Sequence, residues 1–163
     1  MMSILDHVLK NYKIVGQQDL YSYKKKRTLK KSGNKNKGYY FFTIINKKRR
    51  CLFFHRVLFM LYYKYEPKYI DHINRNRLDN RIENLRECTA AENLMNREKT
   101  KNKNTSSKHK GVSFICVNKK YYYWRARLGR KDLGLFKTEK EAAIAYNKAA
   151  KEKYEEFALL NVI

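Results

Sequence analysis

The sequence predicts an α+β protein built from two modules. Short segments rich in aromatic and β-branched residues are followed by segments with helical spacing, and this succession occurs twice in the 163 residues. Between them, residues 97–108 carry no large apolar side chain, as is typical of a linker. We therefore expect a basic N-terminal segment of uncertain structure (1–36), a first domain (37–97), a basic linker (98–108) and a second domain (109–163).

The composition indicates a polyanionic partner. The chain has 38 Lys and Arg against 15 Asp and Glu, a formal net charge of +23. Such an excess attracts nucleic acid, which releases its counterions on binding. No membrane span is expected, because His55 and Arg56 interrupt the apolar runs, and the N-terminus lacks a signal-peptide pattern.

The cysteines predict no metal knuckle and no disulfide framework. Cys51, Cys88 and Cys116 lie far apart and form no C-x-x-C pair. We expect reduced, mostly buried thiols.

The first module is predicted to open with a hairpin and a helix. Residues 39–45 are typical of a strand, 46–48 of a turn, and 49–53 of the returning strand. From His55 to Tyr63 the spacing becomes helical, and Pro67 closes this region.

A strand, a loop, a second strand and a helix are predicted to follow. The strands cover 69–73 and 84–88, and the polar loop covers 74–80. Thr89 and Glu92 form the pattern of a capping box, which marks the start of a helix.

Within this unit, Asp71, His72, Asn84 and Asn93 offer the groups that phosphodiester hydrolysis requires. An imidazole with a pKa near the usual value of about 6.5 accepts a proton at neutral pH. Carboxylate and amide oxygens suit Mg²⁺ or Mn²⁺ rather than a thiol-binding metal. A lone Asp-His pair is often structural, but the ordered set of four favours a metal-dependent nuclease site.

These residues resemble the HNH nucleases, particularly the homing endonucleases of phages, introns and large DNA viruses, over residues 38–96. The motifs D-H-I-N, N-R-I-E-N-L and E-N-x-x-N occur in the family's order. The resemblance implies a ββα-metal unit in which His72 is the general base. Asp71 and Asn93 would bind one divalent cation, Mg²⁺ or Mn²⁺. Asn84 would pin the loop and orient the imidazole.

Two positions depart from the family pattern. Asn93 stands where many relatives have His, and Arg75 where Gly is frequent. If the turn is retained, a positive φ at Arg75 costs about 1 kcal/mol, and its side chain is a candidate phosphate contact. His55 also lies where relatives often have His, and we expect it to pack or to contact phosphate.

The second module is predicted to be a three-stranded antiparallel sheet packed on one helix. The strands cover 110–117, 121–128 and 131–136. Alternate residues of the middle strand are either apolar or arginine: Trp124, Ala126 and Leu128, against Arg125 and Arg127. A capping box at Thr138 opens a helix with one face of small residues and a tyrosine: Ala142, Ala143, Tyr146, Ala149 and Ala150.

This module resembles the DNA-binding domain of plant ethylene-response (Apetala-type) factors, over residues 109–161. The shared motifs include W-R-A-R, L-G-L-F and E-A-A. The resemblance implies a sheet that enters the DNA major groove, with Arg125 and Arg127 projecting and Lys110 and Ser113 beside them. Lys110 and Ser113 replace arginines of the plant domains, so the plant target sequence does not transfer.

The sequence thus predicts a metal-dependent, homing-type HNH DNA endonuclease that acts as a monomer or homodimer. We expect double-stranded DNA as partner and no small-molecule cofactor. We also expect an intracellular, non-secreted protein that stays with DNA, in host cytoplasm or nucleus if viral. One alternative is a non-catalytic, sequence-specific DNA-binding regulator with a vestigial HNH unit. A third hypothesis is an RNA-binding basic protein. The lack of an aromatic base-stacking motif in the sheet disfavours it, whereas the aromatic run Tyr121–Tyr123 favours it.

Overall fold

The computed structural model describes residues 3–34, 38–46, 48–99 and 105–163. Helices are combined with sheets of antiparallel strands, which confirms the predicted α+β class. The chain divides into two compact units, Met1–Ala90 and Ala91–Ile163.

The N-terminal segment, whose structure the sequence left open, is folded. It consists of α1 (Ile4–Asn11), β1 (Tyr12–Val15), β2 (Asp19–Ser22) and β3 (Arg27–Thr28). Ser3 starts the helix through a capping box with Asp6. The strands then pair antiparallel in the order β1-β2-β3.

The predicted hairpin and helix of the first module are confirmed. After β4 (Ser32–Asn34), β5 (Tyr39–Asn46) pairs antiparallel with β6 (Lys48–Phe53), which leads directly into α2 (Phe54–Tyr63). The helix ends because Lys64 adopts a left-handed conformation, with φ of 63°.

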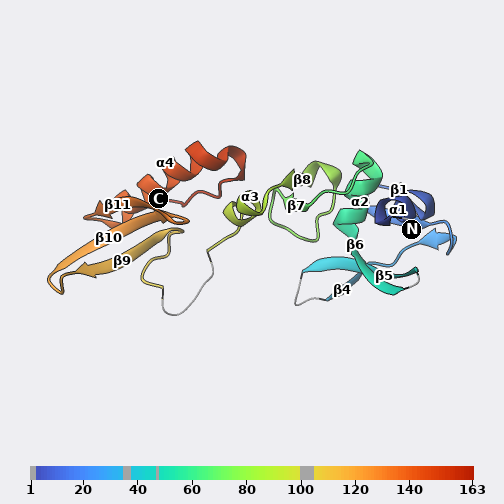
Figure 1. The fold of residues 1–163 in the computed structure, drawn as a ribbon, viewed down its shortest axis with the longest axis horizontal. Coiled ribbons are helices and arrows are strands. Elements are labelled where there is room, and N and C mark those ends of the chain that lie inside the picture. The colour runs from blue at the N-terminus through green and yellow to red at the C-terminus, as the bar shows by residue number, and fades with distance from the viewer. Residues whose placement is uncertain (1–2, 35–37, 47, 100–104) are drawn as a thin grey trace. The chain divides into compact units, whose positions relative to one another are not determined.

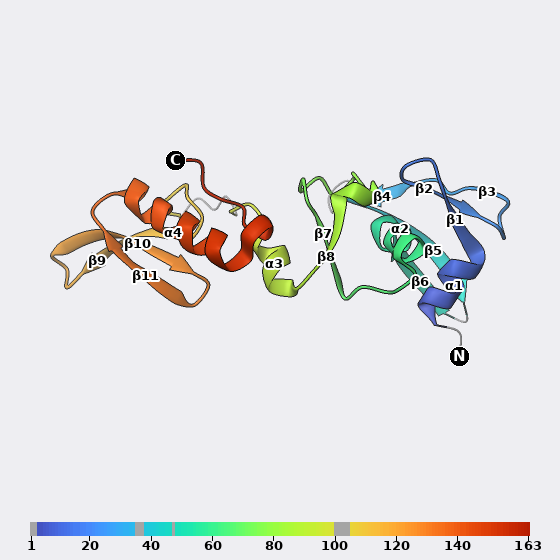
Figure 2. The same cartoon turned by 90° about the horizontal axis from the view of Figure 1, so that it is seen from above.

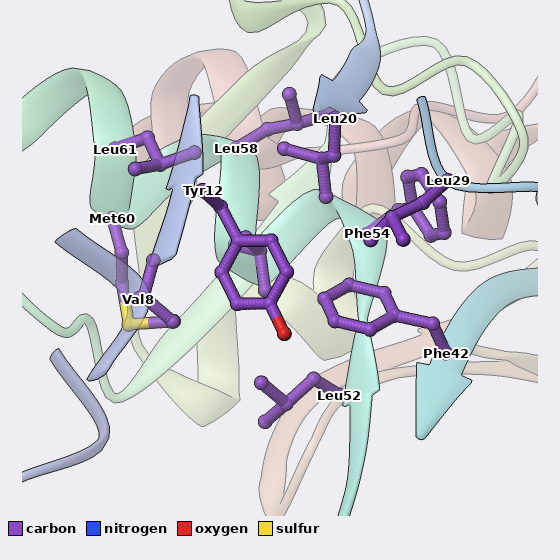
Figure 3. Packing of buried hydrophobic residues seen from close by; sticks show 11 residues of the cluster. Val8, Tyr12, Leu20, Leu29, Phe42, Leu52, Phe54, Leu58, Met60 and Leu61 are labelled. Carbon is purple, nitrogen blue, oxygen red and sulfur yellow. The ribbon is translucent and has the colours of Figure 1, made fainter. Parts of the chain in front are cut away.

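One hydrophobic core joins the N-terminal segment to this hairpin and helix. In Figure 3, the ring of Tyr12 lies among side chains from both parts, including Phe42 and Leu52. Figure 2 shows α1 and β1 beside α2. Val8, Leu20 and Phe54 are fully buried, and each contributes about 1.5–3 kcal/mol through burial. The N-terminal segment is therefore an integral part of the first unit.

The strand-loop-strand prediction is also confirmed. β7 (Tyr69–His72) pairs antiparallel with β8 (Leu85–Cys88), and a short 3₁₀ turn, η1 (Ile82–Asn84), precedes β8. Phe59 of α2 packs against Ile70 and Leu85, so this hairpin is fixed to the helix. The helix α3 (Ala90–Met95) starts directly after Thr89.

The second unit has the predicted sheet and helix. β9 (Val112–Val117), β10 (Tyr121–Leu128) and β11 (Lys131–Phe136) form an antiparallel sheet in the order β11-β10-β9. The helix α4 (Glu139–Tyr154) lies along this sheet (Figure 1) and is followed by η2 (Glu155–Phe157). The capping box at Thr138 is present. The predicted small-residue face packs on the sheet through Ala142, Ala143, Tyr146 and Ala150, with Ala149 partly buried.

The prediction of mostly buried thiols is wrong. Cys88 is buried, whereas Cys51 and Cys116 are exposed, and all three are free. Cys51 and Cys116 lie on β6 and β9, which are edge strands of their sheets. No helix in the described ranges is long and apolar enough to cross a membrane.

Candidate functional site

A tight turn after β7 places His72 at the start of the polar loop. The backbone N–H of Arg75 donates to the carbonyl of His72 at 2.8 Å. Arg75 has φ of 64°, so the turn is retained with a non-glycine residue in the left-handed region. The N–H of Ile73 donates to the carbonyl of Asn84 at 2.9 Å, which ties the start of the loop to its end.

Asn84 pins this loop through its side chain. Its Oδ1 accepts from the N–H of Asn74 at 2.9 Å, and its Nδ2 donates to the carbonyl of Asp79 at 2.7 Å. Asp79 also accepts from Asn74 Nδ2 and forms a salt bridge with Arg81, both at 2.8 Å. These contacts, chiefly the hydrogen bonds with Arg81, hold the pKa of Asp79 well below its usual value. The loop is therefore fixed at both ends.

The side-chain amide of Asn80 forms a hydrogen bond with the imidazole of His72. His72 Nε2 and Asn80 Oδ1 are 3.0 Å apart, and both residues are buried. Because an amide oxygen only accepts, Nε2 carries the proton and Nδ1 carries the lone pair. The backbone N–H of Asn80 donates to Gln18 Oε1 at 3.0 Å. Sequence reasoning gave the orienting role to Asn84 and missed Asn80, although Asn80 opens the N-R-I-E-N-L motif.

Burial keeps the imidazole of His72 neutral. It lowers the pKa of His72, while the hydrogen bond with Asn80 and the negative charge of Asp71 oppose this shift. A neutral ring with a lone pair on Nδ1 is able to take a proton at neutral pH.

A second imidazole packs against the first. The rings of His55 and His72 have centroids 5.2 Å apart at 67°, and Tyr39 contacts both rings. Burial, and then electrostatic interaction with the His72 ring and with Arg56, lower the pKa of His55 to about 3. Of the two roles expected for His55, packing is the one that these ring contacts show.

Two buried nitrogen atoms beside His72 have no hydrogen-bond partner among the described residues: His55 Nδ1 and Asn80 Nδ2. Leaving such an atom unpaired costs about 1–3 kcal/mol. Unsatisfied polar groups of this kind are found at functional sites, where binding or chemistry requires them.

Asp71 is held by an arginine on the neighbouring strand. Asp71 faces Arg86 in the register of β7 and β8, and its Oδ2 accepts from Arg86 Nη2 at 2.9 Å and Nε at 3.0 Å. Both side chains are largely buried, with 6% of Asp71 and 15% of Arg86 exposed. Sequence reasoning missed Arg86, because cross-strand register is not readable from one strand alone. The pair fixes the carboxylate beside His72.

The carboxylate oxygen of Asp71 suits a hard cation whose coordination is completed by oxygens of water or phosphate. In the part of the chain that the structure describes, no group of three or more His, Cys, Asp or Glu is placed to hold a metal ion. Mg²⁺ is usually bound by one or two protein oxygens, waters and substrate phosphates, and Asp71 supplies such an oxygen. Asn93 lies on α3, beyond the boundary of the first unit, so its approach to Asp71 remains a prediction.

In the second unit, β10 presents the predicted arginines. Arg127 is exposed and Arg125 is half-buried, whereas Ala126 and Leu128 between and beyond them are buried. Ser113 lies opposite Arg125 in the register with β9. A hollow of about 610 Å³ is lined by several basic residues, including Arg97, Lys99, Lys110, Arg125 and Arg127.

Lys99 and Lys110 both donate hydrogen bonds to backbone carbonyls. Lys110 Nζ donates to the carbonyls of Met95 at 2.6 Å and Arg97 at 2.8 Å, at the end of α3. Burial, followed by the charge of Arg97, lowers the pKa of Lys110 to about 8. Lys99 Nζ donates to the carbonyls of Ser107 and His109 at 2.8 Å. A DNA contact by Lys110 stays a prediction, and it requires the ammonium to leave these partners.

The described ends of the predicted linker fold onto the second unit. Ser107 Oγ donates to Glu139 Oε1 at 2.7 Å and accepts from the N–H of His109 at 2.9 Å. His109 is buried. Residues 100–104 of the predicted linker lie outside the described residues.

Comparison with known proteins shows that part of this chain is similar to HNH endonucleases. Residues 52–95 match the family model described as HNH endonuclease. This range contains β7, the pinned loop, β8 and α3. The chain is also similar to an uncharacterised HNH endonuclease of Acanthamoeba polyphaga mimivirus, with 36% identity over 99 residues, 58% of this chain and 48% of that protein.

Among solved structures, the chain is similar to one that describes DNA binding and cleavage by the HNH homing endonuclease I-HmuI. The identity is 28%, the coverage is 53% of this chain and 51% of that chain, and the TM-score is 0.45. The chain thus spans about half the length of the relatives that it matches. The family model does not extend over β9, β10 and β11.

Proposed function

We propose that this protein is a metal-dependent, homing-type HNH endonuclease that hydrolyses phosphodiester bonds of double-stranded DNA, one strand at a time. The observation that carries the proposal is the fixed orientation of the His72 ring. Its Nε2 forms a hydrogen bond with Asn80 Oδ1 at 3.0 Å, and both residues lie in the segment that matches the family model. Asp71 is adjacent to it and is held by Arg86. The formal net charge of +23 supports a nucleic-acid substrate.

In this proposal, His72 is the general base. Its Nδ1 takes a proton from the attacking water, and Asn80 keeps Nε2 protonated and the ring oriented. Asp71 and Asn93 would hold one divalent cation, Mg²⁺ or Mn²⁺. When bound, such an ion neutralises charge that develops on the scissile phosphate and the departing oxygen. Asn84 keeps the loop in the conformation that presents His72.

The second unit would choose and hold the DNA site. Arg125 and Arg127 would project from the exposed sheet face to bases or phosphates, with Ser113 beside Arg125. Lys110 and Arg75 are proposed phosphate contacts. In this respect the unit would act like the ethylene-response-factor domain that it resembles.

A second candidate function is a non-catalytic, sequence-specific DNA-binding regulator with a vestigial HNH unit. Its support is Asn93, which offers only a neutral oxygen where many HNH nucleases have an imidazole. It is disfavoured by the buried hydrogen bonds around His72, because a vestigial site has no need of an oriented base.

The decisive experiment is nicking of supercoiled plasmid with Mg²⁺ or Mn²⁺ by the wild type and His72→Ala. We expect the variant to lose at least about 100-fold in rate at equal DNA occupancy, because general-base catalysis contributes about 10²–10⁴-fold. DNA affinity, measured by fluorescence anisotropy, should stay within about twofold.

The matched control is His7→Ala, which removes a partly buried imidazole of α1 and should leave the nicking rate unchanged. Equal loss of binding and cleavage in His72→Ala would contradict the assigned role. Tight DNA binding without cleavage by the wild type would favour the regulator.

A further inference from the structure

The N-terminal segment reaches the candidate nuclease site through one side chain. Gln18 lies between β1 and β2, 62 positions before Asn80, and its Oε1 accepts from the backbone N–H of Asn80 at 3.0 Å. Asn80 is 1% exposed and its Oδ1 meets the imidazole of His72. A continuous chain of two hydrogen bonds therefore runs from Gln18 to the base.

The backbone on both sides of Gln18 is held by packing and strand pairing. It directly precedes β2, where Leu20 is fully buried in the core that includes α2. β1 and β2 pair in register from Tyr12 with Ser22 to Val15 with Asp19. The turn that contains Gln18 is thus held on both sides. Its side chain therefore extends toward Asn80 from a fixed backbone position.

Loss of the Gln18 acceptor would act on His72 through Asn80. The N–H of Asn80 would be left without this partner at a buried position, and the residue would shift to find another. Its Oδ1 is what keeps the proton on Nε2 of His72 and the lone pair on Nδ1. A displacement of about 1 Å at a catalytic group costs up to about 100-fold in rate.

We propose that Gln18 is a positioning residue for His72, so that the N-terminal segment completes the nuclease site. This inference rests on the proposed function and deepens it. Gln18 lies outside the segment that matches the HNH family model, residues 52–95. The site would therefore depend on a contact that the matched motifs do not include.

The kinetic test compares three variants in single-turnover nicking of supercoiled plasmid with Mg²⁺. Gln18→Met keeps the length of the side chain without the acceptor, and we expect its rate to fall about tenfold with DNA affinity within about twofold. Gln18→Glu retains an acceptor oxygen and should keep most of the rate. Gln17→Met is the matched control, because Gln17 is an exposed glutamine of the same turn, and should match the wild type.

A second readout does not depend on cleavage. Long-range ¹H–¹⁵N correlation spectra of the metal-free protein report which ring nitrogen of His72 carries the proton. We expect the Nε2–H form in the wild type, in Gln18→Glu and in Gln17→Met, and a shift toward a mixture in Gln18→Met. If Gln18→Met does not fold, Gln18→Asn, which is one methylene too short to reach Asn80, takes its place with the same expectation.

The outcomes separate the two proposals. A wild-type rate and an unchanged His72 tautomer in Gln18→Met would overturn the positioning role. Equal losses of nicking rate in Gln18→Met and Gln18→Glu, with the wild-type tautomer of His72 in both, would also overturn it. The contact would then be purely structural. A wild type that nicks no DNA would defeat the proposed function, whereas the spectra would still decide whether Gln18 sets the state of His72.

Discussion

In the first unit the polar groups of the candidate site are buried, whereas in the second unit the candidate DNA contacts lie on an open sheet face. Asp71, His72, Asn80 and Asn84 are each at most 7% exposed. Arg127, by contrast, is exposed above buried Ala126 and Leu128. Proton transfer requires fixed geometry and a dry surrounding. Attraction of a polyanion requires accessible charge.

The hydrophobic cores of the two units are also built from different kinds of chain segments. The core of the first unit combines residues from Val8 to Leu61, and a hydrogen bond between Asn80 and Gln18 joins the candidate site to the N-terminal segment. The second unit packs one helix of small residues on a sheet formed by consecutive strands. Damage to the N-terminal segment should therefore affect chemistry, and damage to the sheet face should affect binding.

The largest effect is expected from Leu20→Ala. Leu20 is fully buried, and removal of a buried leucine side chain costs about 3 kcal/mol. We expect the first unit to unfold at lower denaturant concentration, as followed by its methyl NMR signals. Trp124, the sole tryptophan, reports the second unit and should show an unchanged transition.

Leu9→Ala is the control for this change, because Leu9 is 37% exposed on α1 and should cost less than about 1 kcal/mol. A parallel shift of the Trp124 transition in Leu20→Ala would show that the two units unfold together, and would break the comparison between them.

A smaller effect is expected from the double variant Arg125→Ala and Arg127→Ala. We expect DNA affinity to fall about 30-fold and the salt dependence of binding to weaken by about two phosphate contacts, because two guanidinium groups are lost. The nicking rate at saturating DNA should be retained. Affinity is measured by anisotropy over a series of salt concentrations.

Arg130→Ala removes an exposed charge in the turn between β10 and β11 and should change affinity by less than about threefold. An equal loss in this control would mean that overall charge, rather than the β10 face, binds the DNA.

At neutral pH the smallest effect is expected from His55→Phe, and this effect grows as the pH falls. Burial lowers the pKa of His55 to about 3 in the folded protein, whereas the unfolded value is about 6.5. Above pH 6.5 the ring is neutral in both states. Between these values the unfolded chain binds a proton that the folded protein does not, so the folded state loses about 1.4 kcal/mol per pH unit as pH falls.

His55→Phe removes this loss, and its free energy of unfolding should fall less steeply than that of the wild type from about pH 6 to pH 4. Denaturant titrations at several pH values, followed by methyl signals of the first unit, measure the two slopes. Tyr122→Phe, an exposed aromatic change in the second unit, should leave the slope as in the wild type. Parallel curves for His55→Phe and the wild type would contradict the buried, neutral state of His55.

Local patterns in the sequence determined most elements of the fold. The strand and helix boundaries of the first module were predicted to within one or two residues, as for β7 (Tyr69–His72) and α2 (Phe54–Tyr63). The helix start at Thr138 followed from its capping box. These features depend on side-chain periodicity and on hydrogen bonds between residues three positions apart, which a sequence displays directly.

The sequence by itself also determined the basic character of the chain and the residues that resemble HNH motifs, including Asp71 and His72. Only the tertiary structure decided which groups hold them: Arg86 from the facing strand, Asn80 from the end of the loop, and Gln18 from the N-terminal segment. It also decided that this segment belongs to the core of the first unit. These partners are set by strand register and long-range packing, which bring together residues that no local pattern connects.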